Sequence, residues 1–395
     1  MLRLLTAGES HGQALAGIIE GLPAGLDIDA RYINRQLARR QQGYGRGARM
    51  KIEQDEVKII SGVRGGKTLG SPVTIIIENL NYPEWEEIMA PESIRTDRVV
   101  ERPRPGHADL AGGMKYGHAD LRNVLERASA RETAVRVALG AVCRKFLEKF
   151  GIQIYSQVVS IGSVVAAPVP VEGENIERLM AQVDGSPVRC FEDEKTREMI
   201  QEIDRARAAG ESLGGSFEVG ALGIPPGLGS YAQWDRRLDS RLAAGLMSIP
   251  AIKAVEIGEG LAGAGTPGSG VHDEIFYDTD MGLERGTNRA GGIEGGVSNG
   301  ETVWARAYMK PIPTLMRPLA SVNISTWQAE RAQVERSDVC AVPAAAVVGE
   351  AVMAWMMAEA FLEKFSGDNL EQVKLNYTGY MQYLRKVWKW IRTSS

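Results

Sequence analysis

The stretch RPGHADLAGGMKYGHADLRNVLERASARETAVRVALGAVCRKFLEKF, residues 104–150, carries the strongest indications of both the fold and the site. Its second half predicts a helix over about Ala130–Phe150. Apolar residues recur there at helical spacing, at Val135, Leu139, Val142 and Phe146. Ser129 and Glu132 match a capping box at the start of that helix. We therefore expect a regular helix directly after a segment rich in arginine and histidine.

The start of this helix is also a candidate anion site. A helix N-terminus offers free amide donors and about half a unit of positive charge. Ser129–Arg131 could then hold a negatively charged group, whereas the alternative is that Ser129 is an ordinary helix cap. The pattern alone leaves both interpretations open.

Strands and helices are mixed on both sides of this stretch. Strand-like runs occur at Val57–Gly62, Pro72–Glu78, Ile152–Ile161, Gly215–Leu222, Ala254–Ile257 and Thr302–Met309. Further helical patterns occur at Ala30–Gln41, Glu194–Ala209, Leu238–Ser248, Ala344–Phe365 and Leu370–Ile391. The mixture predicts an α+β or α/β layered core. Because no linker, low-complexity tract or obvious repeat divides the chain, we expect one domain over residues 1–395.

The totals argue against several classes of protein. The 395 residues are 44% hydrophobic, enough for a sizeable core, and the formal net charge of -4 argues against bulk binding of nucleic acid or membrane surfaces. Cys143, Cys190 and Cys340 lie far apart without metal-ligand spacing, so we expect reduced thiols in a cytoplasmic protein. The richest apolar run, Val342–Met357, contains Glu350 and predicts a buried helix rather than a membrane span.

A cluster of basic residues lies in RRQQGYGRGARM, residues 39–50, and its arginines are Arg39, Arg40, Arg46 and Arg49. The intervening glycines allow tight turns, so the guanidinium groups can converge on one small anion instead of splaying along a helix. Two alternatives remain open. One is a solvated basic loop, and the other is an arginine–glycine segment that binds single-stranded RNA, although such segments are usually longer and contain aromatic residues.

Two of the four histidines occupy polar, turn-like segments that suit proton transfer. They are His11 in GESHG and His107 in RPRPGHAD, where prolines stiffen the backbone beside Arg104. His118 belongs to a second His-Ala-Asp-Leu copy and His272 stands apart, so we expect both to be structural. A metal site made from both copies has no established ligand geometry, so we expect no metal.

Two motif matches lack the context that their chemistry requires. GESHG does not have the GxSxG order of a nucleophile elbow, which disfavours a serine hydrolase. Residues 258–263 match GxGxxG after a strand-like segment. The glycine-rich residues that follow are not expected to form the helix of a dinucleotide-binding turn.

Seven stretches together resemble the chorismate synthase family in order and spacing along essentially the whole chain. They are AGESHG (7–12), RRQQGYGRGARM (39–50), RPGHADLAGGMKYGHADLRNVLERASARETA (104–134), SIPAIKAVEIG (248–258), NRAGGIEGGVSNG (288–300), KPIPTL (310–315) and RSDVCAVPAA (336–345). The resemblance implies a shikimate-pathway lyase that eliminates phosphate from 5-enolpyruvylshikimate 3-phosphate, in an anti-1,4 sense, to give chorismate. It also implies a need for reduced FMN, although no net redox change occurs.

The resemblance assigns binding residues as well. Five arginines would bind the substrate: Arg40, Arg46, Arg49, Arg104 and Arg131. The flavin would be held by Ser129, Ala130, Arg131, Pro250, Ala251, Gly295, Lys310, Pro311, Ile312, Pro313, Thr314 and Arg336. Since the substrate carries a phosphate and two carboxylates, an arginine-rich site is the expected counter-charge.

His11, His107 and Asp338 correspond to catalytic residues of the family. By resemblance, His11 protonates or hydrogen-bonds the leaving phosphate, His107 balances the charge of the reduced flavin, and Asp338 accepts the proton of flavin N5. Some relatives have histidine where Ser337 stands, so no role is carried over to it. Others have glutamine where Pro250 stands, so we expect at most a backbone or packing contact there.

The fold implied by the resemblance is a single α+β domain, a β-α-β sandwich with helices packed between antiparallel sheets. The implied assembly is a cytoplasmic homotetramer with no nucleic-acid or membrane partner. NADPH would act only indirectly, in flavin reduction, and the chain looks like relatives that depend on an external flavin reductase. Two alternatives are a pyridine-nucleotide-dependent flavin reductase and a non-catalytic RNA or polyanion binder, and the acidic net charge counts against the second.

Overall fold

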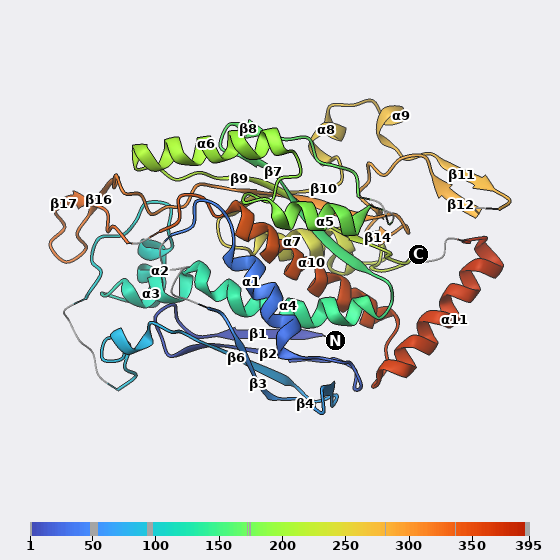
Figure 1. The fold of residues 1–395 in the computed structure, drawn as a ribbon, viewed down its shortest axis with the longest axis horizontal. Helices are drawn as coiled ribbons and strands as arrows, with labels where there is room; N and C mark the ends of the chain where they lie inside the picture. Colours follow the sequence, from blue (N-terminus) through green and yellow to red (C-terminus); the bar gives the residue numbers. More distant parts are fainter. Residues whose placement is uncertain are drawn as a thin grey trace.

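The computed structural model describes residues 2–47, 54–92, 98–171, 173, 175–280, 282–335 and 337–391. Two antiparallel sheets lie on opposite sides of a layer of long helices (Figure 1). The first sheet has four strands in the order β1–β2–β6–β3, and their bounds are β1 Arg3–Ala7, β2 Ala14–Glu20, β6 Val73–Glu78 and β3 Val57–Ser61. In β6 alternate residues, Val73, Ile75 and Ile77, are fully buried against the helices, as expected for a sheet with one face on the core.

The second sheet has five strands in the order β10–β15–β9–β7–β8. Their bounds are β10 Ile252–Ile257, β15 Val303–Met309, β9 Gly215–Leu222, β7 Gln153–Ile161 and β8 Val164–Val165. Both faces of this sheet are covered near β7. Ile154 belongs to the main core, whereas its neighbour Tyr155 packs with Leu179 and Val183 of helix α5 (Ile176–Gly185) on the other face.

Three helices form the central layer: α1 (Ala30–Gln41), α4 (Thr133–Glu148) and α10 (Val342–Lys364). Helix α4 packs against β2 and β6, and α10 packs against β7, β9 and α4. Helix α10 is buried all round, which explains why it is apolar without a polar face. It is long and apolar enough to cross a membrane, but 89% of its most apolar stretch is buried inside the protein. It is the central core helix.

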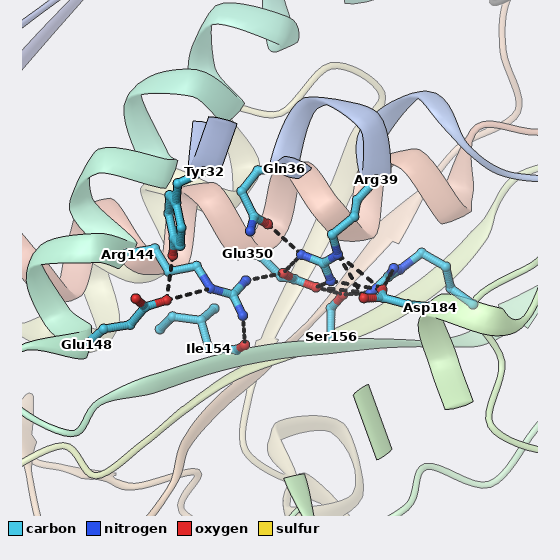
Figure 2. A network of polar contacts seen from close by, with 10 residues as sticks. Tyr32, Gln36, Arg39, Arg144, Glu148, Ile154, Ser156, Asp184 and Glu350 are labelled. Atoms are coloured by element: carbon cyan, nitrogen blue, oxygen red, sulfur yellow. Dashed lines mark hydrogen bonds and ion pairs between the residues drawn. The ribbon is translucent and has the colours of Figure 1, made fainter. Parts of the chain in front are cut away.

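A buried ionic network joins the three central helices to the second sheet (Figure 2). The Glu350 carboxylate of α10 accepts hydrogen bonds from Arg39 of α1, at 2.6 and 2.8 Å, and from Arg144 of α4, at 2.6 Å. Ser156 of β7 and Arg189 donate to the same carboxylate at 2.7 and 3.0 Å. This network fixes α1 against its neighbours.

The remaining elements are shorter or peripheral. They are β4 Val63–Arg64, β5 Lys67–Thr68, η2 Tyr82–Glu84, α2 Asp109–Tyr116, α3 Arg122–Ala128, η3 Ala130–Glu132, α6 Asp193–Ala209, η4 Trp234–Arg236, α7 Leu238–Met247, α8 Gly260–Ala264, α9 Gly268–Val271, β11 Ile275–Asp278, β12 Gly282–Arg285, β13 Ile293–Glu294, β14 Val297–Ser298, β16 Ala320–Val322, β17 Ala329–Arg331 and α11 Leu370–Trp388. Helix α7 packs on β10 and α10, and α11 extends along the right side of the molecule (Figure 1).

The predicted strands appear as β3, β6, β7, β9, β10 and β15, and the predicted helices as α1, α4, α6, α7, α10 and α11. The α+β sandwich with helices between antiparallel sheets is confirmed. Two local predictions need correction. Ser129 caps the 3-10 turn η3 by accepting from the Arg131 amide, and α4 begins only at Thr133. A short helix, α8, does open within the GxGxxG match, but it ends after five residues, too short for the helix of a dinucleotide-binding turn.

Candidate functional site

Arg40 and Arg131 are buried together around Asp55. Arg40, at the end of α1, lies 3.3 Å from an Asp55 oxygen and donates to the Thr133 hydroxyl at 3.0 Å and to the Ala130 carbonyl at 3.1 Å. The Arg131 guanidinium binds the other Asp55 oxygen and donates to Asn79 at 2.9 Å. The last turn of α1 and the turn η3 therefore present two guanidinium groups side by side.

Asp338 is held next to this pair by the arginine–glycine segment. Its carboxylate accepts the backbone amide of Gly47 at 2.6 Å and lies 3.2 Å from Arg46. The backbone amide of Val339 donates to the Gly45 carbonyl at 2.8 Å, which fixes the two segments together. Gly45 has a φ of +90°, a conformation that favours glycine. The predicted tight turn between the arginines is present.

His11 is fixed by the buried carboxylate of Glu126 on α3. Its backbone amide donates to Glu126 at 2.8 Å, and its Nδ1 lies 3.0 Å from both carboxylate oxygens. The His11 ring stacks on Trp85 with centroids 4.0 Å apart. Burial raises the pKa of Glu126, but hydrogen bonds from His11 and the charges of His11 and Arg122 outweigh it and hold that pKa below its usual value.

Asn79 connects the His11 loop to the arginine pair. Its side-chain amide donates to the carbonyls of Glu9 and Gly12, at 3.1 and 2.6 Å, and its oxygen accepts from Arg131 at 2.9 Å. Because Asn79 follows β6 directly, the first sheet positions both groups. The loop that carries His11 and the Arg131 guanidinium are therefore both hydrogen-bonded to Asn79.

His107 and Arg104 both contact Asp109, the first residue of α2, and Arg104 also contacts Thr314. Arg104 donates to Asp109 from Nε at 2.8 Å and to the Thr314 hydroxyl at 2.9 Å. His107 Nδ1 lies 2.5 Å from Asp109 Oδ1. The Lys310 ammonium donates to the Gly106 carbonyl at 2.5 Å. The proline-stiffened RPRPGH segment and the KPIPT segment are thus joined.

Hydrogen bonds to backbone carbonyls connect these groups into one region. The backbone amide of Lys310 donates to the Ala251 carbonyl at 3.0 Å, and the Arg136 guanidinium of α4 donates to the Ser248 carbonyl at 3.2 Å. On the other side, the Ser212 hydroxyl donates to the Ile312 carbonyl at 2.6 Å, and the next amide, that of Leu213, donates to Val339 at 2.8 Å. The segments around Arg131, Ala251, Lys310, His107 and Asp338 are therefore neighbours in space.

One predicted residue, Gly295, is not brought into this region. Gly295 lies in the β13–β14 turn, and its neighbour Gly296 accepts from the amide of Leu238, at the start of α7. Ala251 and Lys310 lie beyond the opposite end of α7, so Gly295 is separated from them by the length of that helix. Arg49 and Arg336 lie outside the described residues.

The arginine pair and its neighbours carry an excess of positive charge. Burial lowers the pKa of Arg40 to about 10, the charge of Asp55 opposes this, and the like charges of Arg46 and Arg131 lower the pKa further. Three guanidinium groups thus face two carboxylates, Asp55 and Asp338. An anionic ligand would neutralise the excess, and guanidinium groups match phosphate and carboxylate oxygens in geometry. This donor set fits a phosphate-bearing cofactor or substrate.

Two cavities in the described part of the chain lie elsewhere. One, of about 10 Å³, lies beside Glu350 and Arg144 in the core. The other, of about 270 Å³, is lined by His272, Asp273 and Glu294. Among the described residues, no group of histidine, cysteine and acidic side chains is arranged to hold a metal ion. The site is therefore identified by its contacts and charge, not by a cavity.

Several residues of this region were not singled out from the sequence: Asp55, Asn79, Trp85, Asp109 and Glu126. Only Asp109 had a visible signal, because it lies two residues after His107 in the repeated motif. The others are distant in sequence from their partners. Glu126 binds a histidine 115 positions earlier, and no local pattern marks such a contact.

Comparison with known proteins gives a consistent result. Residues 2–362 match the family model described as chorismate synthase. The chain is 60% identical over 392 residues to the chorismate synthase of Syntrophomonas wolfei, covering 99% of both chains, and 59% identical over 387 residues to that of Desulforudis audaxviator, covering 98% of both. A crystal structure of a chorismate synthase superimposes with a TM-score of 0.80 at 44% identity over 98% of each chain.

Proposed function

Because the chain belongs to the chorismate synthase family, and is therefore a shikimate-pathway lyase, we propose that it eliminates phosphate from 5-enolpyruvylshikimate 3-phosphate in an anti-1,4 sense to give chorismate, with reduced FMN. The observation that carries the proposal is the convergence of three distant parts of the chain, which contribute Arg40 with Arg46, Arg131, and Asp338. A triply acidic small molecule matches this charge.

Substrate binding would use Arg40, Arg46, Arg104 and Arg131, with Arg49 also assigned to this set. Buried guanidinium groups donate strong, directional hydrogen bonds to phosphate and carboxylate oxygens. Their own partners in the protein fix their positions before the ligand arrives, so little ordering is needed on binding. The same positive charge would stabilise the phosphate as it departs.

Reduced FMN, when bound, supplies electron density that lets the carbon–oxygen bond break without net oxidation. Its binding residues would be Ser129, Ala130, Arg131, Pro250, Ala251, Lys310, Pro311, Ile312, Pro313, Thr314 and Arg336, with Gly295 considered below. The contact of Lys310 with Ala251 supports a shared edge for a flat ligand, because it joins two of these segments. Pro311 and Pro313 stiffen that edge.

Proton transfers are assigned to His11, His107 and Asp338. His11 would protonate or hydrogen-bond the leaving phosphate, and its stacking on Trp85 fixes the plane of the ring. His107 would balance negative charge near the flavin. Asp338 would act as the proton-accepting carboxylate, and its contacts with Gly47 and Arg46 hold it in place.

Further parts of the proposal concern the whole protein. We infer one catalytic domain over residues 1–395, a homotetramer in the cytoplasm, and a flavin supply from an external reductase that uses NADPH. Sedimentation of the purified protein measures the subunit number.

The decisive experiment is anaerobic. Purified protein is mixed with chemically reduced FMN and 5-enolpyruvylshikimate 3-phosphate, and chorismate and phosphate are followed together. We expect equal amounts of both, and neither with oxidised FMN alone. No product under reducing conditions would contradict the proposed reaction.

A further inference from the structure

The sequence contains the motif His-Ala-Asp-Leu twice, and the structure uses the two copies differently. In the first copy, His107 Nδ1 lies 2.5 Å from Asp109 Oδ1. In the second, Asp120 accepts the backbone amides of Val100 and Arg122, both at 2.9 Å. His118 has a 3.5 Å contact with Asn123 instead. The first copy is a histidine–carboxylate pair, and the second is a local backbone cap.

Asp109 is surrounded by groups from the candidate site. Its side chain has no exposed surface, and it accepts three hydrogen bonds from Arg104 in addition to the contact with His107. The same guanidinium reaches Thr314 at 2.9 Å. Burial raises the pKa of Asp109, but hydrogen bonds from His107 and Arg104 outweigh it and leave the pKa far below its usual value. Asp109 is therefore an ionised carboxylate that binds both His107 and Arg104.

The position of Asp109 determines which nitrogen of His107 carries the hydrogen. A carboxylate can only accept, so a contact of 2.5 Å requires a hydrogen on Nδ1. Arg104 Nη2, which donates to Asp109 Oδ1 at 3.1 Å, also lies 3.0 Å from Nδ1, but an Nδ1 that carries a hydrogen has no free lone pair and cannot accept from it. In the neutral ring Nε2 is then the acceptor, and this is the nitrogen that can take up a proton.

We propose that Asp109 is a positioning residue for the reaction, which holds His107 in the Nδ1-protonated form and holds Arg104 against Thr314. This inference rests on the proposed function through the roles of His107 and Arg104. Asp109 acts only through these side chains. This buried carboxylate thus determines which nitrogen of His107 exchanges a proton. It also orients the Arg104 guanidinium, which would bind the substrate, toward Thr314 of the flavin-binding segment.

The variant Asp109→Asn makes a specific prediction because the two carboxylate oxygens have different donors. Oδ2 accepts both the amide and Nε of Arg104, at 3.1 and 2.8 Å. We expect the asparagine oxygen to keep these two bonds, so that its NH₂ group points toward His107. An amide NH₂ is a donor, so His107 Nδ1 must become the acceptor and the hydrogen must move to Nε2. The variant therefore switches the tautomer.

The primary test is magic-angle-spinning ¹⁵N NMR of sedimented full-length protein labelled at histidine nitrogens. Only four rings contribute, and His107→Gln identifies the signal of His107. We expect the neutral His107 ring to be protonated at Nδ1 in the wild type and at Nε2 in Asp109→Asn. Asp120→Asn is the matched control and should leave His107 unchanged. An Nε2-protonated His107 in the wild type overturns the proposal, even if Asp109→Asn does not fold.

Turnover and flavin binding give a second readout. In the folded Asp109→Asn variant we expect phosphate release to slow at least about 10-fold, whereas Asp120→Asn stays near the wild type. Affinity for oxidised FMN, measured by fluorescence quenching, should fall in the first variant only. Wild-type turnover in Asp109→Asn, or an unchanged tautomer, contradicts the proposed role. If the wild type itself releases no phosphate, the proposed function fails, and the NMR result still tests the contact.

Discussion

At the scale of single residues, the two candidate catalytic histidines have the same arrangement. His11 is held at Nδ1 by Glu126, and His107 is held at Nδ1 by Asp109. The histidines could be predicted because each lies in a polar, turn-like segment. Glu126 could not, because it lies in an ordinary helical sequence and meets His11 only when α3 packs beside the first sheet. Short-range patterns mark reactive side chains but not the partners that orient them.

Removing the carboxylate from Glu126 should impair His11. In Glu126→Gln the side chain keeps its size but loses the charge that holds the ring, so we expect turnover to fall at least about 10-fold. Glu84→Gln, exposed on the turn η2 beside Trp85, is the control and should behave as the wild type. Initial rates of chorismate formation with reduced FMN measure the effect. Equal rates in both variants would exclude an orienting role for Glu126.

Histidine substitutions separate the proton-transfer residues from the structural ones. We expect His11→Ala to slow turnover by about 10²–10⁴-fold, the usual contribution of a positioned acid or base. His118→Ala should leave the rate unchanged, because its ring contacts Asn123 and lies near the Tyr116 ring, and neither residue belongs to the candidate site. Single-turnover kinetics with premixed reduced FMN measure the chemical step. A normal rate for His11→Ala would remove it from the mechanism.

At the scale of secondary-structure elements, sequence patterns located the long helices, the strands β3 and β6 of the first sheet, and all strands of the second sheet except β8. The strands β1 and β2 were not predicted, because RLLTA is too short for a clear alternation and the sequence of β2, ALAGIIE, does not alternate polar with apolar residues although its burial alternates. The helices α2 and α3 have eight and seven residues and were likewise not predicted. Such elements are stabilised by their neighbours rather than by their own sequence. They nevertheless position His11, Asp109 and Glu126.

The Glu350 network should make stability depend on pH. Burial raises the pKa of Glu350, but the charges of Arg39, Arg144 and Arg189 outweigh it and hold the pKa far below its ordinary 4.5. The unfolded chain therefore takes up this proton before the folded one does. The contribution is present above about pH 4.5 and is lost as the pH falls below it.

Replacement of this carboxylate is expected to be severe. Glu350→Gln leaves three buried guanidinium groups without their anion, so we expect the free energy of unfolding to fall by about 3–5 kcal/mol at neutral pH. The difference from the wild type should shrink as the pH falls below 4.5. Urea unfolding at a series of pH values measures both effects. If the difference in unfolding free energy between wild type and Glu350→Gln does not change with pH, it does not come from the charge of Glu350.

The contact between α4 and α10 depends on a glycine. A Cβ at Gly140 would lie 2.4 Å from the Ala351 Cβ and 2.6 Å from its Cα, so the two helices must move apart. We expect Gly140→Ala to lower stability by about 1–3 kcal/mol. On α11, a Cβ at Gly379 would meet nothing within 4 Å, so Gly379→Ala should raise stability by up to about 1 kcal/mol. Thermal unfolding compares the two, and a stabilised Gly140→Ala would contradict the close packing.

At the scale of the whole molecule, the order of strands could not be derived from their sequences. The second sheet places β10 beside β15 and β9 beside β7, so its neighbours come from positions far apart in the chain. Alternation specifies which face of a strand is buried but not which strand lies next to it. The topology could therefore be predicted only from the family resemblance, whereas the positions of the helices and strands along the chain could be predicted from the sequence patterns.

This arrangement has a consequence for the flavin. Gly295 lies in the β13–β14 turn beside the start of α7, and Ala251 and Lys310 lie beyond the other end of this helix, so the ten residues of α7, about 15 Å, separate them. The side chains Leu242 and Leu246 of this helix are fully buried. A flat ring held at Lys310 cannot also contact Gly295 of the same chain. If both residues contact one flavin, Gly295 must come from a second copy of the chain.

Mixing two inactive variants tests this directly. A Cβ at Gly295 meets nothing within 4 Å, but its φ of +59° is a left-handed conformation, which asparagine and aspartate adopt more readily than other non-glycine residues. Gly295→Asp places a negative charge at the contact, Gly295→Asn is the control for backbone strain, and Lys310→Ala removes the other contact. With sites shared across a two-fold interface, each hybrid pair has one intact site, so co-refolded mixtures should recover about one quarter of wild-type turnover. Gly295→Asp alone and Lys310→Ala alone should be nearly inactive, and mass spectrometry of intact oligomers should show that hybrids have formed. If hybrids form and turnover is not recovered, each flavin is held within a single chain, and Gly295 must be withdrawn from the site.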